Sequence, residues 1–401
     1  MAKAKSPSLI HPVETMFKKN YPALLPALKV ALAVCIGLVF KEKAKPLSLI
    51  LENPSGRGKS TVIESFFPVE DKAFAEMKDY VYRSDAFTPK SFVTSAANMN
   101  EAKREKIDLL PKIQNKYLLT KELAPIFRGQ EKDLIEMFKI LIPILDGDGF
   151  VINTGLASRG YSEAIVFNWL GATTPLLRNA FKIMSQLGTR LLFYETPVID
   201  FAEDDLIAYA KRNDVSDAAA KCNRAVNRFV IEFYRRHPHG SVSFNSISIS
   251  DQRIERLVKL ANFLVKARAE VVYERDNGTY KPVGVKPSEG PHKVINYFKE
   301  IACALALIHE RRAVNEDDMA QVKHIAISST PNHLQPLIWE LAAKGEFTTK
   351  RGVELCQVSD TTISERYSKE LELIGVIESP NSQSGAKTVY KLHKSLAWIT
   401  K

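Results

Sequence analysis

The stretch that most constrains the fold is residues 47–61, LSLILENPSGRGKST. Its first part, Leu47–Leu51, is a continuous apolar run with the length of a fully buried strand. A glycine-bearing turn follows, and Thr61–Glu64 then begins a helix. Strand, glycine loop and helix are the setting in which free backbone N–H groups and a lysine hold phosphate oxygens. We therefore predict a nucleotide site here.

The loop departs at its first position from the pattern G-x-x-x-x-G-K-[ST], because Asn53 stands where the first glycine is expected. Asparagine tolerates left-handed backbone angles well, so the loop is still expected to close. Lys59 is expected to reach the β- and γ-phosphates, and the Ser60 hydroxyl to hold Mg²⁺. An ordinary surface turn is the alternative. The residues expected to bind nucleotide are Asn53, Pro54, Ser55, Gly56, Arg57, Gly58, Lys59, Ser60 and Thr61.

Composition restricts the class of protein. A chain of 401 residues is long for one core and suggests two or three domains. An excess of 56 Lys+Arg over 46 Asp+Glu, a net charge of +10, favours polyanionic partners. The four cysteines are scattered without metal-ligand or disulfide spacing, which fits a reducing cytoplasm.

One apolar segment, Leu24–Phe40, resembles a membrane span but carries Pro26 and Lys29. It also falls short of about 18 uninterrupted apolar residues. We predict a core helix here, no contact with membrane, and a cytoplasmic protein.

Up to residue 203 the chain alternates predicted strands with predicted helices, which is typical of a parallel α/β sheet. The predicted strands are 47–51, 79–87, 116–120, 165–172 and 191–194. Residues 204–330 are mainly long amphipathic helices, with a hairpin around Asn277-Gly278, and are predicted to form a helical lid domain.

Residues 331–401 are predicted to form a third domain. Three short helices, at 333–344, 348–356 and 359–374, precede two strands, Val376–Glu378 and Thr388–Leu392. Three helices followed by a hairpin are typical of a winged helix-turn-helix.

Three polar residues lie at strand boundaries of the α/β domain. Glu122 follows the third strand, Thr174 follows the fourth, and Arg190 follows Gly188 near the fifth. Ligands bind at the carboxyl ends of strands in such sheets, so these residues are expected to converge on Lys59. As alternatives, Glu122 and Thr174 serve only as helix-start residues, and Arg190 only as a surface ion-pair partner.

The order of these pieces, over roughly residues 46–328, resembles the AAA+ ATPases, in particular the MCM-like and related phage and plasmid helicase branch. The resemblance implies ATP and Mg²⁺ as cofactors and a ring of identical subunits, with a hexamer expected. It makes Lys59 and Ser60 the Walker A pair and Glu122 the Walker B glutamate. It also implies that Thr174 is sensor one.

The resemblance further implies that Arg190 is the arginine finger, which acts on the nucleotide of a neighbouring subunit. Lys293, where the family usually has arginine, becomes sensor two, and an ordinary exposed lysine is the alternative. Lys121 departs from the family, since the Walker B aspartate that orients Mg²⁺ is expected there. A lysine beside the metal is repelled, so its side chain is expected to point away. Three aspartates are candidates to help the metal instead: Asp108, Asp146 and Asp148.

Two segments are candidates for DNA binding. The insert 146–161 carries Arg159 near its turn, and hairpins at this place line the central pore of related ATPases; a solvated loop is the alternative. In the winged helix, hydroxyl and basic side chains at a helix start suit phosphate and base-edge contacts, although such modules also dock proteins. The candidate residues there are Thr361, Thr362, Ser364, Arg366, Lys369, Lys387 and Lys391.

These features together predict an ATP-hydrolysing, ring-forming, MCM-like helicase or translocase that acts on DNA, in replication or in a mobile element. One alternative is a nucleotide-dependent DNA-binding switch, such as an initiator, loader or regulator, that does not translocate. A second is a scaffold that does not hydrolyse ATP, which Lys121 and Asn53 favour.

Overall fold

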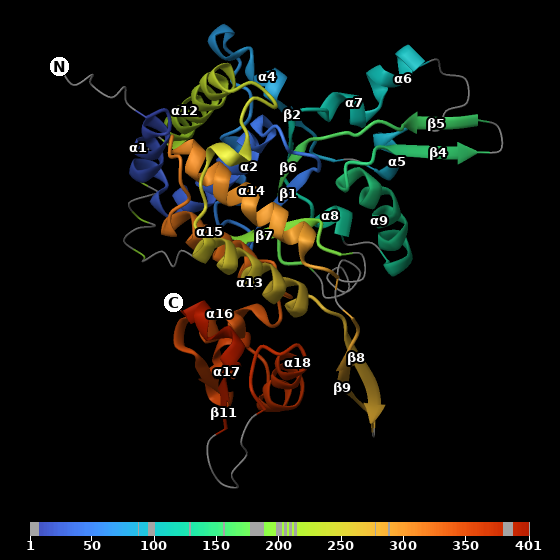
Figure 1. Ribbon diagram of the computed structural model, residues 1–401, viewed down its shortest axis with the longest axis vertical. Coiled ribbons are helices and arrows are strands. Elements are labelled where there is room, and N and C mark those ends of the chain that lie inside the picture. The colour runs from blue at the N-terminus through green and yellow to red at the C-terminus, as the bar shows by residue number, and fades with distance from the viewer. Residues whose placement is uncertain are drawn as a thin grey trace.

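A five-stranded parallel sheet organises the computed structural model (Figure 1). In spatial order its strands are β2 (Val81–Arg83), β3 (Tyr117–Thr120), β6 (Asn168–Thr173), β1 (Leu47–Glu52) and β7 (Leu191–Glu195). The structure describes residues 8–86, 88–94, 101–127, 130–154, 157–176, 188–197, 203, 207, 211, 215–276, 278–287, 289–379 and 388–400.

The central strands β1, β3 and β6 are buried at every position. Burial on both faces requires continuous apolar runs, which explains why these strands are visible in the sequence. The predicted parallel α/β sheet is therefore confirmed. The strand predicted at 79–87 is too long, because residues 77–80 form the short helix α4 and only Val81–Arg83 pair with β3.

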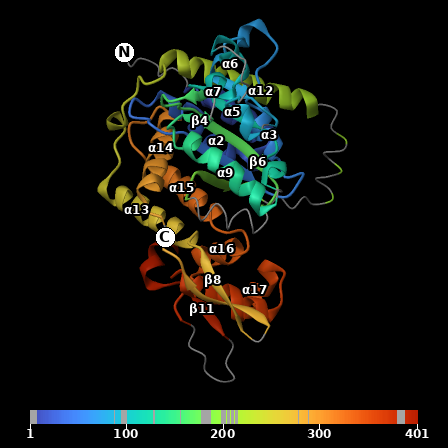
Figure 2. The ribbon, with the colours of Figure 1, turned by 90° about the vertical axis from the view of Figure 1, so that its right-hand side faces the viewer.

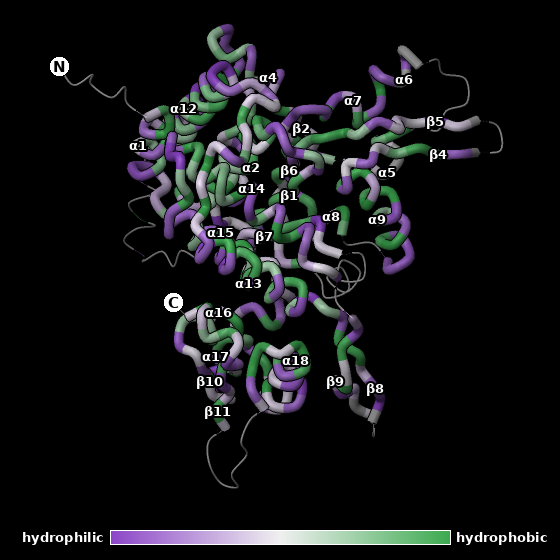
Figure 3. Tube along the Cα trace, viewed as in Figure 1, coloured by the Kyte–Doolittle hydropathy of each residue, from purple (hydrophilic) through white to green (hydrophobic). Residues whose placement is uncertain are grey.

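Helices cover both faces of this sheet. The α-helices of the described residues up to 328 are α1 (His11–Asn20), α2 (Leu25–Ile36), α3 (Lys59–Glu64), α4 (Met77–Tyr80), α5 (Pro89–Phe92), α6 (Glu101–Ile107), α7 (Leu109–Ile113), α8 (Ala124–Phe127), α9 (Glu131–Leu145), α12 (Val215–Arg236), α13 (Asp251–Ala267), α14 (His292–Ile308) and α15 (Glu316–Ser328). One face of α9 is apolar and buried, and Figure 3 shows hydrophobic and hydrophilic segments along this helix. The sequence also predicts a helix at 176–187, of which residues 177–187 lie outside the described residues.

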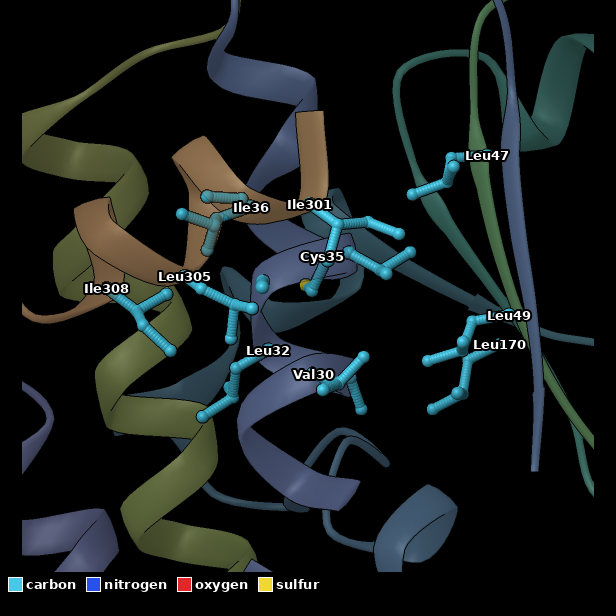
Figure 4. Close-up of a cluster of buried hydrophobic side chains, with 14 of the residues drawn as sticks. Val30, Leu32, Cys35, Ile36, Leu47, Leu49, Leu170, Ile301, Leu305 and Ile308 are labelled. Carbon is cyan, nitrogen blue, oxygen red and sulfur yellow. The ribbon is translucent and has the colours of Figure 1, made fainter. Parts of the chain in front are cut away.

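Helix α2 lies in the core between the sheet and α14. Figure 4 shows Val30 of α2 facing Leu49 and Leu170 of the strands, with Leu305 of α14 on the other side of α2. Within the described residues, one segment, Pro22–Val39, is long and apolar enough to cross a membrane, and 72% of it is buried inside the protein. The prediction of a core helix here is confirmed.

The helices of residues 215–328 share this core. One buried apolar cluster runs from α1 through α2 and β1 to α12, α13, α14 and α15. The boundary predicted between residues 203 and 204 therefore does not coincide with a break in the core. The hairpin predicted in this region is present as β8 (Val271–Asp276) and β9 (Thr279–Val285), and its Asn277 lies outside the described residues.

A second hairpin, β4 (Phe150–Thr154) and β5 (Ala157–Tyr161), forms the predicted insert between α9 and β6. Its strands are antiparallel, with Ile152 opposite Arg159. In Figure 1 the hairpin extends away from the sheet, on the side of α9.

Residues 331–400, here called the C-terminal module, have an apolar cluster that includes Leu337, Phe347 and Ile363. Figure 2 shows the module beyond α13 and α15, with the β8–β9 hairpin beside it. Its elements are α16 (Gln335–Lys344), β10 (Glu346–Thr348), α17 (Thr349–Cys356), the π-helical turn η5 (Thr362–Tyr367), α18 (Ser368–Leu373), β11 (Val389–Lys391) and the 3₁₀ helix η6 (Lys394–Thr400).

The strand pairing predicted for this module is only partly right. Strand β11 pairs antiparallel with β10, whereas residues 376–378 contribute an isolated bridge between Ile377 and Leu392. The Phe347 and Tyr390 rings face each other across β10 and β11, with centroids 4.9 Å apart. This buried aromatic pair favours the β10–β11 register.

Candidate functional site

The loop between β1 and α3 curls around its own lysine. Gly56 and Gly58 have φ of 78° and 82°, in the left-handed region that glycine adopts without strain. A Cβ at Gly58 would also lie 2.7 Å from Leu24 Cδ1. Lys59 is only 6% exposed, and its Nζ donates to the Asn53 carbonyl at 2.6 Å and the Pro54 carbonyl at 2.9 Å.

Asn53 does not close the loop in the expected way. Its backbone is outside the left-handed region, so the expectation of left-handed closure at this residue is wrong. Its buried side chain instead donates to the Thr196 carbonyl at 2.5 Å and the Thr196 hydroxyl at 2.9 Å. Asn53 thus ties the loop to the chain that follows β7.

Two carboxylates influence the Lys59 ammonium. Burial lowers the pKa of Lys59, and the negative charges of Glu122 and Glu52 partly offset that effect. Glu122 is thus close enough to Lys59 for its charge to act on the ammonium. Its Oε1 also accepts the Ala124 N–H at 2.9 Å, the helix-start role that was the alternative.

The order of strands brings Glu122 and Thr174 to one end of the sheet. Strand β6 lies between β3 and β1, so the turn after β3 lies against β6. The Leu123 N–H donates to the Ala172 carbonyl at 2.7 Å, and a Cβ at Gly171 would overlap the Leu123 side chain. Thr174 directly follows β6, whose last residue is paired with Glu52. These residues share the carboxyl end of the sheet with Lys59.

Lys121 forms an ion pair with Glu64, the last residue of α3, and both side chains are exposed. This pairing agrees with the expectation that the lysine points away from a metal. Asp108, by contrast, accepts the Thr94 N–H at 2.8 Å and the Tyr161 hydroxyl at 3.0 Å. The Asp108 carboxylate is therefore not placed to hold a metal at the loop.

Arg190 lies at the opposite end of the sheet from Lys59. It precedes β7, and Leu191 is in register with Ser48 near the start of β1. The five residues of β7 span about 16 Å between the two ends. The expectation that Arg190 joins Glu122 around Lys59 within one chain is therefore wrong.

Arg190 meets the predicted Lys293 at a common carboxylate. Arg190 Nη2 lies 2.7 Å from Asp146 Oδ2, and Lys293 Nζ lies 2.5 Å from Asp146 Oδ1. Burial raises the pKa of Asp146, but the two cations outweigh this effect and lower it. A Cβ at Gly147 would lie 3.0 Å from the Ala44 carbonyl, which places this turn beside the segment before β1. Asp146 and its neighbour Asp148 are thus far from the loop.

Sequence patterns missed Glu52, the last residue of β1. It is 4% exposed, and its Oε1 accepts the Leu176 N–H at 3.0 Å and Asn332 Nδ2 at 2.8 Å. Burial raises the pKa of Glu52 to about 7, with a contribution from Glu195, while its hydrogen bonds and Lys59 act in the opposite direction. A glutamate that ends an apolar strand directly before a glycine loop was the available signal.

Glu195 ends β7 opposite Glu52 in register. Burial raises its pKa, and Trp339 Nε1 donates to its Oε2 at 2.9 Å. Asn332 and Trp339 both come from the C-terminal module, so no local pattern pointed to them.

The predicted DNA-binding residues differ in their surroundings. Thr361 and Lys391 are exposed, and Lys369 pairs with Glu372 at 2.8 Å. The Arg366 guanidinium lies 5.4 Å from the centroid of the Tyr273 ring on β8. Arg159 is half-buried on β5, and Lys387 lies outside the described residues.

The chain matches no protein-family model and no curated protein. Within the ranges that the structure describes, no group of three or more His, Cys, Asp or Glu side chains is placed to hold a metal ion. Function is therefore inferred from the geometry of the loop and its neighbours.

Glu52 makes folding stability depend on pH. Its pKa rises from an ordinary 4.5 to about 7 on folding, so its favourable contribution is complete below pH 4.5 and is lost as the pH rises through 7. We expect Glu52→Gln to exceed the wild type in unfolding free energy by up to about 3 kcal/mol at pH 8, and the gap to close near pH 5. Urea unfolding of both proteins at pH 5 and pH 8 measures the two unfolding free energies.

The exposed Glu255→Gln is the matched control and should show no such change with pH. If the difference in unfolding free energy between Glu52→Gln and the wild type is the same at pH 5 and pH 8, the raised pKa of Glu52 is contradicted.

Proposed function

We propose that this chain is an AAA+ P-loop ATPase that acts on DNA. The observation that carries the proposal is the loop in which Gly56 and Gly58 turn around the buried ammonium of Lys59, between a parallel strand and a helix. Loop carbonyls now accept from this ammonium. Phosphate oxygens of ATP are charged and therefore stronger acceptors, and would replace them.

The carboxyl end of the sheet supplies groups for hydrolysis. Glu122 lies near Lys59 and would take a proton from the attacking water. Thr174 would donate its hydroxyl to the γ-phosphate. The exposed Ser60 at the start of α3 would hold Mg²⁺, which neutralises phosphate charge and keeps most of its own water ligands. The pairing of Lys121 with Glu64 is compatible with a cation beside Ser60.

Arg190 and Lys293 support a ring of identical subunits, with a hexamer as the proposed form. They lie at the amino end of the sheet, where they do not reach the loop of their own chain. If Arg190 is the arginine finger, it must therefore act across a subunit boundary. At that boundary, a phosphate of the nucleotide bound to the neighbouring subunit would replace Asp146 as its partner.

DNA is the proposed partner because of the net charge of +10 and the two candidate segments. The β4–β5 hairpin would present Arg159 to a central pore. The C-terminal module, taken as a winged helix, would contribute Thr361 and Lys391, which are exposed. Arg366 contributes less, since it packs on Tyr273.

Translocation on DNA by a cytoplasmic, MCM-like helicase is the form of the proposal that the hairpin favours. A nucleotide-dependent switch without translocation is the second candidate, because Asn332 and Trp339 connect the C-terminal module directly to the loop end of the sheet.

Lys59→Ala should abolish the thermal stabilisation that MgATP gives the wild type, because the variant lacks the cation for the phosphates. Lys121→Ala is the matched control, since Lys121 is exposed and paired with Glu64. Differential scanning fluorimetry with a series of MgATP concentrations measures both. Equal stabilisation of Lys59→Ala and wild type by MgATP would show that the loop around Lys59 is not the nucleotide site.

Glu122→Gln should bind MgATP with near-wild-type affinity and lose hydrolysis about 100-fold or more, because an amide is a poor general base. Phosphate release with and without DNA measures turnover, and calorimetry measures binding. Glu64→Gln is the control, an exposed carboxylate paired with the neighbouring Lys121. Unchanged turnover in Glu122→Gln would exclude Glu122 as the base.

Arg190→Ala and Lys59→Ala should each be inactive alone and recover part of the ATPase activity when mixed. A mixed ring contains junctions with an intact loop on one side and an intact arginine on the other. The positive charge of an arginine finger raises the rate of hydrolysis by about 10³-fold or more, so the ATPase activity of the mixture should exceed that of either variant alone. Wild-type turnover of Arg190→Ala in an assembled, DNA-stimulated oligomer would exclude Arg190 as the finger.

A further inference from the structure

The C-terminal module is fastened to the same end of the sheet that carries the loop. Asn332 Nδ2 donates to Glu52 Oε1 at 2.8 Å, and Trp339 Nε1 donates to Glu195 Oε2 at 2.9 Å. In addition, His324 Nε2 lies 2.8 Å from the Glu195 carbonyl. The His324 ring lies 5.0 Å from that of Trp339, measured between centroids.

The two carboxylates belong to the strand ends that hold the loop. Glu52 and Glu195 are paired in register, and Asn53 and Thr196 follow them. The Asn53 amide joins the two chain segments through its bonds to Thr196. These bonds link the loop to both attachment points of the module.

We propose that Asn332 is a positioning residue that couples nucleotide binding at the loop to the attachment of the C-terminal module, through its hydrogen bond to Glu52. This inference rests on the proposed nucleotide site. The ligand class is a nucleoside triphosphate with Mg²⁺, and the responding element is α16, which begins three residues after Asn332.

The coupling follows from the charges around Glu52. The Lys59 ammonium stabilises the Glu52 carboxylate in the ligand-free protein, while burial and Glu195 oppose its charge. Phosphates draw the ammonium toward themselves and add negative charge nearby. The fraction of Glu52 that is still ionised then takes a proton from solvent.

A neutral carboxyl accepts a weaker hydrogen bond from Asn332 than a carboxylate does. Nucleotide therefore loosens the start of α16. By linkage, a partner that holds the module away from the sheet strengthens nucleotide binding by the same factor.

Hydrogen exchange of the Leu337 and Ile338 amides, in the first turns of α16, tests this in the full chain. MgATPγS should speed their exchange about fivefold in the wild type, the low end of measured couplings. Asn332→Ala should exchange fast without nucleotide and show no further increase. Asn262→Ala, an exposed asparagine on α13, is the matched control and should behave as the wild type does.

Glu52→Gln keeps an acceptor for Asn332 but has no charge to lose, so it should bind MgATPγS with unchanged exchange in α16. Calorimetry on the same samples reports binding separately. A wild type that binds MgATPγS while α16 exchanges at the same or a lower rate overturns the coupling alone. A wild type that does not bind MgATPγS overturns the proposed function and the coupling together.

Discussion

The buried ammonium of Lys59 is the group on which the arrangement of the site depends. A cation with 6% exposure must have acceptors, since burial without partners costs several kcal/mol. The loop carbonyls of Asn53 and Pro54 supply them, and the glycines at 56 and 58 allow the backbone to curl closely enough. In the proposed function, a phosphate group would bind within this loop, beside the Lys59 ammonium.

The parallel sheet separates two sets of polar groups by the length of its strands. Lys59, Glu52 and Glu122 gather at the carboxyl end. Arg190 and Lys293 converge on Asp146 at the amino end. If both sets serve one reaction, as proposed, they must come from different subunits, and assembly becomes a condition for catalysis.

The sequence predicted features that depend on local patterns. The strands, the glycine loop and the core helix α2 follow from apolar runs and from Gly56 and Gly58. Arg190 was misplaced because it precedes its strand, whereas Glu122 follows one. Glu52 and Asn332 are 280 residues apart, so only tertiary structure joins them. The β10–β11 pairing is likewise favoured by an aromatic contact between residues far apart in the sequence, Phe347 and Tyr390.

A structure of the protein with bound MgATPγS would show whether the loop binds nucleotide. We expect phosphate density inside the loop, with Lys59 Nζ about 3 Å from a phosphate oxygen and no longer bonded to the Asn53 and Pro54 carbonyls. An empty loop in which Lys59 keeps those two carbonyls, while nucleotide is bound elsewhere on the chain, would contradict this expectation.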